Sequence, residues 1–270
     1  MFIFLTFLFV PIFCVKASTP IKILLVPGHD NEIWGAQYGN TKEADMTLSL
    51  ATQIYNLLKK DKRFEVQITR DKKGYIKEFA EYFVQEEMEI SVFKEKAKQL
   101  TLEKIINGSF LQKENVVHNT VTKSVSNILY GINKWANENA MDAVIHIHFN
   151  DYPRSTKWKI GKHQGFSIYL PDNQLVNWKG SGQLAANIFT QLKKKYNTST
   201  YDKELGGLIP DQKLIALGSN GTLLEDVRSV LIEYGYIYEK KFRTSSVRLQ
   251  SYKDMAALTV VGIKNYFFPK

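Results

Sequence analysis

The sequence predicts a single α/β domain with a mostly parallel, twisted sheet flanked by helices. Five short aliphatic runs are typical of buried strands, and apolar residues recur at helical spacing in the segments between them. Such alternation of strands and helices favours a layered fold with a largely parallel sheet. The 270 residues are long enough to bury one core of this kind, and we place the domain at residues 21–270.

Each element is predicted from its own local pattern. The predicted strands are IKILLVP from Ile21, FEVQIT from Phe64, DAVIHIHF from Asp142, GFSIYL from Gly165 and SVLIEYGYI from Ser229. The clearest helical segments are ADMTLSLATQIYNLLKK, GQLAANIFTQLKKK and SYKDMAALTVVGIKNYFF, which fall between or after these strands.

One segment, at about 74–131, departs from this alternation. It contains a charged run with helical character, followed by a polar stretch typical of a loop. We interpret it as a helical insertion that either covers a cleft, serves as a docking site for a protein regulator, or is a solvated spacer.

The first 17 residues form an apolar segment that is typical of a signal peptide. Apolar residues from Phe2 to Val15 precede a Val-x-Ala step that ends at Ala17. The run is shorter than the roughly 20 residues of a membrane-spanning helix. It predicts a secreted or cell-envelope protein, with an uncleaved anchor or a buried first strand as the alternatives. The sole cysteine, Cys14, lies inside it, so a mature chain would have neither disulfides nor thiolate catalysis.

The formal net charge of +9 predicts attraction to polyanions. The sequence has no glycine-rich phosphate loop and no basic patch interleaved with aromatic residues, so we expect no nucleic-acid binding. For an exported chain, an anionic cell wall is the better partner. Lysines scattered over a solvated surface are the alternative explanation.

Several polar residues follow predicted strands at the points where ligands bind in open α/β sheets. His29 comes just after the first strand, His148 ends AVIHIH, and Glu233 ends SVLIE. Glu43 opens the helix after the His29 loop, with Thr41 as its expected N-cap. These four residues are therefore expected at one edge of the sheet.

Two imidazoles and one carboxylate are a typical catalytic zinc set, and a second carboxylate can serve as general base. Glu43 suits the ligand role and Glu233 the base role, although the sequence alone allows the reverse. His146 shares a strand face with His148 and is a further ligand candidate, with packing as the alternative. Outside these segments, His118 and His163 lie in loop-like contexts that indicate no catalytic role.

In this order, these pieces resemble the zinc-dependent N-acetylmuramoyl-L-alanine amidases, a family of cell-wall hydrolases. The matching stretches are ILLVPGHD, TKEADMTLSLA, VQITRD, ANENAMDAVIHIHFND, GFSIYL and RSVLIEYGYI. The resemblance implies that His29, Glu43 and His148 hold Zn²⁺ and that Glu233 is the general base. It also implies hydrolysis of the amide bond between N-acetylmuramic acid and the L-alanine of peptidoglycan stem peptides.

The chain departs from the family pattern in three places. Ile132 stands where the family has an arginine, Gly235-Tyr236 replaces a Gly-Phe pair, and the segment at about 74–131 is longer than a simple link. Two other functions stay open: another zinc amidohydrolase or peptidase on a related sheet, and a wall-binding module without turnover. We expect a monomer.

Overall fold

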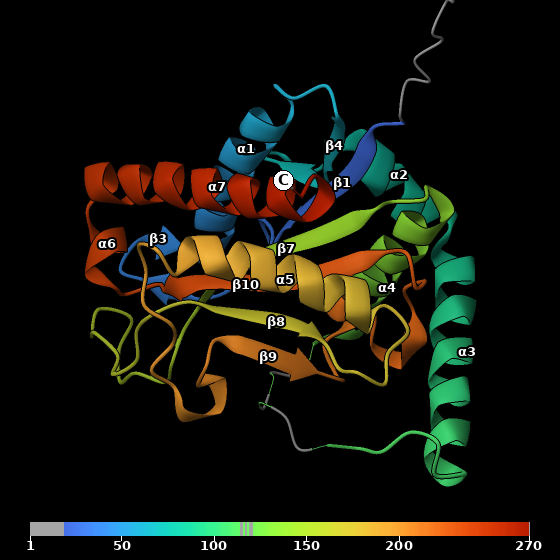
Figure 1. Ribbon diagram of the computed structural model, residues 1–270. Coiled ribbons are helices and arrows are strands. Elements are labelled where there is room, and N and C mark those ends of the chain that lie inside the picture. The colour runs from blue at the N-terminus through green and yellow to red at the C-terminus, as the bar shows by residue number, and fades with distance from the viewer. Residues whose placement is uncertain (1–18, 114–115, 117, 119–120, 270) are drawn as a thin grey trace, which may run out of the picture.

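The computed structural model describes residues 19–113, 116, 118 and 121–269, and its centre is a six-stranded sheet (Figure 1). The strand order is β4-β1-β7-β10-β8-β9, and every neighbouring pair is parallel except β10 and β8. The strands are β1 (Ile21–Pro27), β4 (Phe64–Ile68), β7 (Ala143–Asn150), β8 (Ser167–Pro171), β9 (Leu208–Asp211) and β10 (Arg228–Tyr236). The predicted mostly parallel α/β fold is confirmed.

Three helices cover one face of the sheet. They are α1 (Glu43–Leu58), α5 (Trp178–Leu192) and α7 (Ser245–Phe267), and the short α6 (Lys240–Arg243) leads into α7. Alternate strand residues such as Ile23, Leu25 and Ile145 pack against the apolar sides of these helices. This is the largest hydrophobic cluster among the described residues, and a smaller one covers the other face, so the central strands are apolar on both faces.

The opposite face is covered by α2 (Lys77–Gln85) and α4 (Lys123–Glu138). Phe79 of α2 and Trp135 of α4 pack with Leu24 and Val144 of the sheet, and Ile132, the residue at the family's arginine position, is buried among them. The long α3 (Glu87–Ile106) packs on α4 and α2 and runs along the margin of the domain (Figure 1). Two short hairpins, β2–β3 (Gln37–Tyr38 and Thr41–Lys42) and β5–β6 (Arg70–Asp71 and Gly74–Tyr75), complete the fold.

The segment at about 74–131 holds β6, α2, α3 and the first half of α4. Its expected end at Gly131 falls inside α4, which continues to Glu138. From Leu111 to His118 the described residues contact the ends of β8 and β9. Lys113 pairs with Asp172 at 2.7 Å, and His118 lies 2.8 Å from the Asp211 carboxylate.

The predicted signal peptide, residues 1–17, lies outside the described residues. Within the part that the structure describes, no helix combines the length and the apolar character that crossing a membrane requires.

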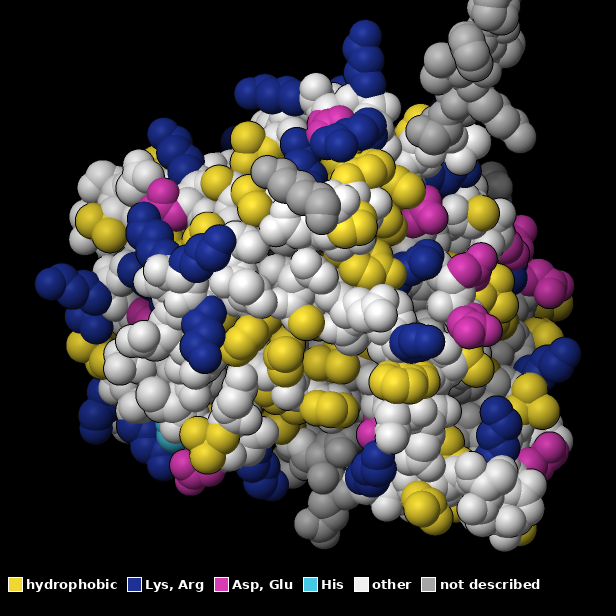
Figure 2. All heavy atoms as spheres, viewed as in Figure 1, with side chains coloured by type: hydrophobic (Ala, Val, Ile, Leu, Met, Phe, Trp, Pro, Cys, Tyr) yellow, Lys and Arg dark blue, Asp and Glu magenta, His cyan; other side chains and the backbone are white. Residues whose placement is uncertain are grey.

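Charge is unevenly distributed over the surface. In Figure 2, Lys and Arg side chains gather along the left margin, on the side where α6 lies in Figure 1.

Candidate metal centre

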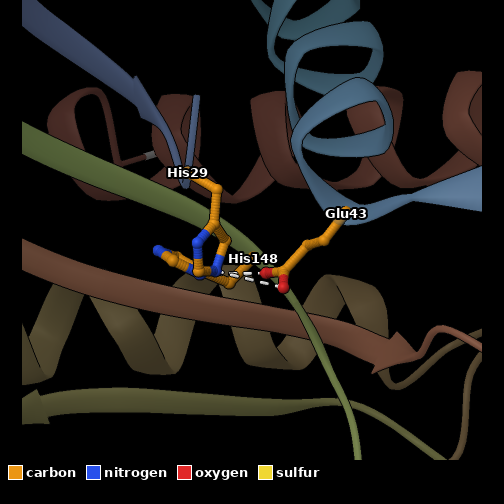
Figure 3. Close-up of side chains that lie close together, drawn as sticks. All are labelled: His29, Glu43 and His148. Carbon is orange, nitrogen blue, oxygen red and sulfur yellow. Dashed lines mark hydrogen bonds and ion pairs between the residues drawn. The ribbon is translucent and has the colours of Figure 1, made fainter. Parts of the chain in front are cut away.

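Three side chains from three elements converge at the carboxyl edge of the sheet (Figure 3). His29 lies in the loop after β1, Glu43 is the first residue of α1, and His148 is near the end of β7. The Nε2 atom of His29 is 3.1 Å from Oε2 of Glu43, and Nδ1 of His148 is 3.1 Å from Oε1 of the same carboxylate. One nitrogen from each imidazole and one carboxylate oxygen all lie within 4.8 Å of one another.

The Glu43 carboxylate is fixed by the backbone as well as by the imidazoles. The amide of Ala36 donates to Oε2 at 2.9 Å, and the amide of Phe149 donates to Oε1 at 3.0 Å. The expectation that Thr41 caps this helix is wrong, because Lys42 occupies the N-cap position and makes no side-chain cap. Thr41 instead pairs in the β2–β3 hairpin, and this hairpin directs Glu43 across the loop toward the sheet.

Two glycines leave the room that the imidazoles occupy. A Cβ atom on Gly28 would lie 2.2 Å from the His148 ring. A Cβ atom on Gly35 would lie 2.4 Å from the His29 ring and 2.5 Å from the Glu43 carboxylate. Because Gly35 also has a φ of +68°, a side chain there is disfavoured by the backbone as well as by the lack of space.

Arg70 joins the segments that carry two of the three residues. Its side chain is buried and donates to the carbonyls of Pro27 and Gly28, just before His29. It also donates to the carbonyl of Ala44 and the hydroxyl of Thr47 in the first turns of α1. These contacts fix the position of the His29 loop relative to the start of the helix that bears Glu43.

The charges at the site suit metal binding. Burial opposes ionisation of Glu43, but the two imidazoles outweigh it and hold the pKa of Glu43 well below its usual range. Burial lowers the pKa of His148 despite the nearby carboxylate, which favours a neutral ring. For His29, burial lowers the pKa, but the charge and hydrogen bond of Glu43 raise it above the ordinary value. A bound cation would compete with a proton at His29, so affinity should fall in acid.

Glu233 lies on β10 directly beside His148, its register partner on β7. Register partners project to the same face, so the two side chains are neighbours. Within the described residues, Oε2 of Glu233 is buried and has no hydrogen-bond partner. Burial, together with the negative charges of Glu43 and Glu204, raises the pKa of Glu233 well above its ordinary value.

Glu204 lies close enough to Glu233 to affect its pKa, and the sequence analysis missed this residue. Its buried carboxylate accepts hydrogen bonds from Asn150 at 2.8 Å, from the Tyr169 hydroxyl at 2.6 Å and from the Tyr236 hydroxyl at 3.1 Å. It lies in the polar stretch YDKELGG, which carries no pattern that distinguishes it from an exposed turn.

The other histidines lie apart from this cluster. His146 is buried on the same strand face as His148 but is not a member of the cluster, and burial lowers its pKa to about 3. His118 pairs with Asp211, and His163 packs against Tyr152 with ring centroids 4.3 Å apart.

The donor set fits zinc. Two ligand atoms of a tetrahedral zinc site are about 3.4 Å apart when each bond is about 2.1 Å. Each imidazole lies 3.1 Å from a Glu43 oxygen, His29 from Oε2 and His148 from Oε1, so each oxygen is at a suitable distance from one imidazole. A neutral imidazole, a second imidazole and an ionised carboxylate are also the donor types of catalytic zinc sites, with a fourth position left for water or substrate.

Comparison with known proteins identifies the family to which this chain belongs. The sequence model of the N-acetylmuramoyl-L-alanine amidases matches residues 85–265, about two thirds of the chain. The chain therefore belongs to the N-acetylmuramoyl-L-alanine amidase family, whose members hydrolyse an amide bond of peptidoglycan. A search of curated proteins gives no match.

Solved structures of amidases share the fold. The CwlD amidase from Clostridioides difficile, in complex with the GerS lipoprotein, is 17% identical, with a TM-score of 0.58 over 92% of this chain and 98% of that chain. The apo form of an N-acetylmuramyl-L-alanine amidase from Mycobacterium abscessus is 16% identical, with a TM-score of 0.59 over 93% and 100%. The catalytic domain of CwlV from Bacillus (Paenibacillus) polymyxa is 14% identical, with a TM-score of 0.56 over 93% and 99%.

Proposed function

We propose that this chain is a zinc-dependent amidase that cleaves the bond between N-acetylmuramic acid and L-alanine in peptidoglycan. In this proposal His29, Glu43 and His148 hold the zinc, and Glu233 is the general base. The observation that carries it is the Glu43 carboxylate, which contacts both imidazoles while Glu233 lies on the strand beside His148. Membership of the amidase family supports the choice of bond.

Each residue has a definable task in such a reaction. Zinc, when bound, supplies a Lewis acid that polarises the carbonyl and acidifies water. Glu233 would accept the proton of the attacking water at its carboxylate and pass it to the leaving nitrogen of L-alanine. Burial and the nearby carboxylates raise the pKa of Glu233, which makes its carboxylate a stronger base toward the proton of the attacking water. The backbone amides of Ala36 and Phe149 keep Glu43 oriented throughout.

The test is mass spectrometry of the soluble products after residues 18–270 are incubated with purified peptidoglycan. Stem peptides with a free L-alanine amino group, lost with a chelator and regained with zinc, are the expected result. Products cut within the peptide would instead indicate the zinc peptidase. No products, from protein that binds zinc and pellets with the wall, would indicate the binding module.

We also propose that residues 1–17 act as a signal peptide that takes the protein to the cell envelope or outside the cell, where its substrate lies. Basic surface charge and the family assignment support this location. Fractionation of cells that express the full chain, with amino-terminal sequencing of the exported form, is the measurement. A full-length protein retained in the cytoplasm would contradict the proposal.

A protein regulator that docks on the segment at about 74–131 stays a prediction. On α3, the exposed side chains Met88, Val92, Leu102 and Ile106 lie on the side away from the buried Ile90 and Ala97. The related CwlD structure is of a complex with a lipoprotein, which is consistent with a partner protein. Ile106→Glu should abolish co-purification of such a partner without unfolding the domain.

A further inference from the structure

A polar cavity lies at the carboxyl edge of the sheet, formed by the loop that follows β7 and by the segment that follows β10, which includes α6. Its volume is about 300 Å³. Its walls come from residues 160–164 after β7 and, after β10, from Tyr238, Glu239 and the α6 residues Lys240, Lys241 and Arg243. It does not include any of the candidate zinc ligands.

Positive charge dominates this cavity. Lys162, Lys240, Lys241 and Arg243 line it, and Glu239 is the acidic residue in the lining. The Glu239 carboxylate is already engaged, since Oε1 accepts the amides of Gly165 and Tyr236 and Oε2 accepts Lys241 at 2.7 Å. Among the described residues, no carboxylate forms an ion pair with Lys162, Lys240 or Arg243. These three cations line the cavity without a carboxylate partner, and the Lys162 ammonium lies 5.0 Å from the centre of the Tyr152 ring.

The backbone that carries these cations is held in place. Gly161 packs so closely on the Tyr238 ring that an added Cβ would lie 2.3 Å from it. The guanidinium of Arg154 lies over the Tyr238 ring, 5.1 Å from the ring centre. It also donates a hydrogen bond to the carbonyl of Gln37 at 2.7 Å. Arg243 is anchored through Nε, which donates to the carbonyl of Tyr238. A backbone held in this way, together with the anchored guanidinium of Arg243, loses less entropy when an anion binds.

We propose that this cavity binds the phosphate groups of an anionic cell-wall polymer and so anchors the enzyme near its substrate. The proposal rests on the proposed wall-hydrolase function. Converging lysines and an arginine suit a phosphate, which offers several acceptor oxygens at once. Nucleic acid is disfavoured because single-strand binding needs exposed aromatic rings for base stacking, and the aromatic ring in this lining, Tyr238, is only 1% exposed.

The experiment is a pelleting assay with zinc-free protein, so that turnover plays no part. The probes are bacterial cell walls that carry a phosphodiester polymer and the same walls stripped of it with hydrofluoric acid. The variant is Lys162→Gln/Lys240→Gln/Arg243→Gln. The control is Lys59→Gln/Lys60→Gln/Lys62→Gln, which removes the same charge from exposed positions at the end of α1, at the opposite edge of the sheet.

We expect the cavity variant to bind native walls at least tenfold more weakly than the wild type, and the control to stay within about twofold. Stripping should weaken the wild type to the level of the cavity variant. Equal losses in both variants would overturn the proposal in favour of net charge, and undiminished binding to stripped walls would assign the anchor to peptidoglycan. Stronger competition by DNA than by the free polymer would also overturn it.

Two further controls keep the result interpretable. Lys162→Gln/Lys240→Gln changes only exposed lysines, so it serves if the triple variant unfolds. Thermal unfolding of each variant checks the fold. Because the assay uses zinc-free protein, absence of amidase products would contradict the proposed function without changing the binding result.

Discussion

His29 has a φ of 62°, a left-handed conformation that few residues other than glycine adopt. The loop that holds it is closed by Asp30, whose carboxylate accepts the amides of Glu32 at 2.9 Å and Ile33 at 2.7 Å. This explains why the histidine lies between a Pro-Gly pair and a polar Asp-Asn stretch. The turn directs the imidazole of His29 toward Glu43. The Asp30 carboxylate stabilises this turn through its two hydrogen bonds.

Gly35→Ala should weaken zinc binding about 10- to 100-fold, because the new Cβ would displace the His29 ring and the Glu43 carboxylate. Gly221→Ala is the matched control. Gly221 has a φ of 69°, close to the 68° of Gly35, but an added Cβ there meets nothing within 4 Å. Both variants should lose about 1 kcal/mol of stability from the left-handed backbone. Equal zinc affinities, measured by competition with a chromogenic chelator, would contradict this account of Gly35.

Glu233→Gln should lower turnover about 10²- to 10⁴-fold, because an amide cannot accept the proton. Zinc stoichiometry and thermal stability should change little, since Glu233 is not a member of the three-residue cluster. The measurements are the rate of stem-peptide release and the zinc content after dialysis. Turnover close to that of the wild type would rule out Glu233 as the base.

Among single residues, the sequence predicted those whose positions follow from the ends of the strands. His29, Glu43 and His148 were expected at one edge because carboxyl ends of parallel strands meet there, and the structure brings them together. Arg70 and Glu204 were missed because their roles depend on contacts with residues far away in the sequence. Their local patterns are those of an ordinary strand end and an ordinary turn.

Among the elements, β1 and α1 act as one unit because Arg70 bonds to both. Arg70→Met should lower the free energy of unfolding by about 2 kcal/mol or more, since several buried acceptors lose their donor. It should also weaken zinc binding about 10- to 100-fold. Arg154→Met, which removes a similarly buried guanidinium from the loop after β7, should cost stability but little zinc affinity. Parallel losses in both variants would indicate a purely structural role for Arg70.

The contact between His118 and Asp211 attaches the chain before α4 to the end of β9, and it should depend on pH. Burial raises the pKa of Asp211, but the hydrogen bonds from His118, Leu214 and Lys213 outweigh it and lower the pKa below its ordinary value. The resulting stabilisation is complete above about pH 4 and is lost as the pH falls through the folded-state pKa. Asp211→Asn should therefore be less stable than the wild type by about 1 kcal/mol at pH 7, with a smaller gap at pH 3 in urea titrations. A gap that does not narrow in acid would contradict this.

Two elements could not be predicted locally. The α4 segment begins in a polar stretch, and its helix depends on the Thr122 cap and on burial of Trp135 against the sheet. The four residues of β9 include Pro210 and form a strand only because β8 offers an edge. The longer strands, by contrast, are apolar on both faces and were identified from that pattern alone.

For the whole molecule, the proposed zinc should stabilise the fold, because its ligands come from three separate segments. Zinc at 100 times its dissociation constant contributes about 2.7 kcal/mol to the native state. In a domain of this size, that corresponds to an increase in melting temperature of about 5–11 °C. Differential scanning calorimetry with and without zinc measures it, and His148→Ala should abolish the shift. A full shift in that variant would place the metal elsewhere.

The strand order also determines when the site can form during synthesis. The central strand β7 lies between β1, which precedes it by more than a hundred residues, and β10, which begins at Arg228. Pairing of such distant segments is slow and gains little until both partners exist. The proposed ligand set cannot assemble before His148 has been made, and the proposed base, Glu233, is made later still. In the proposed mechanism, a growing chain is therefore inert as a hydrolase until Glu233 has been made.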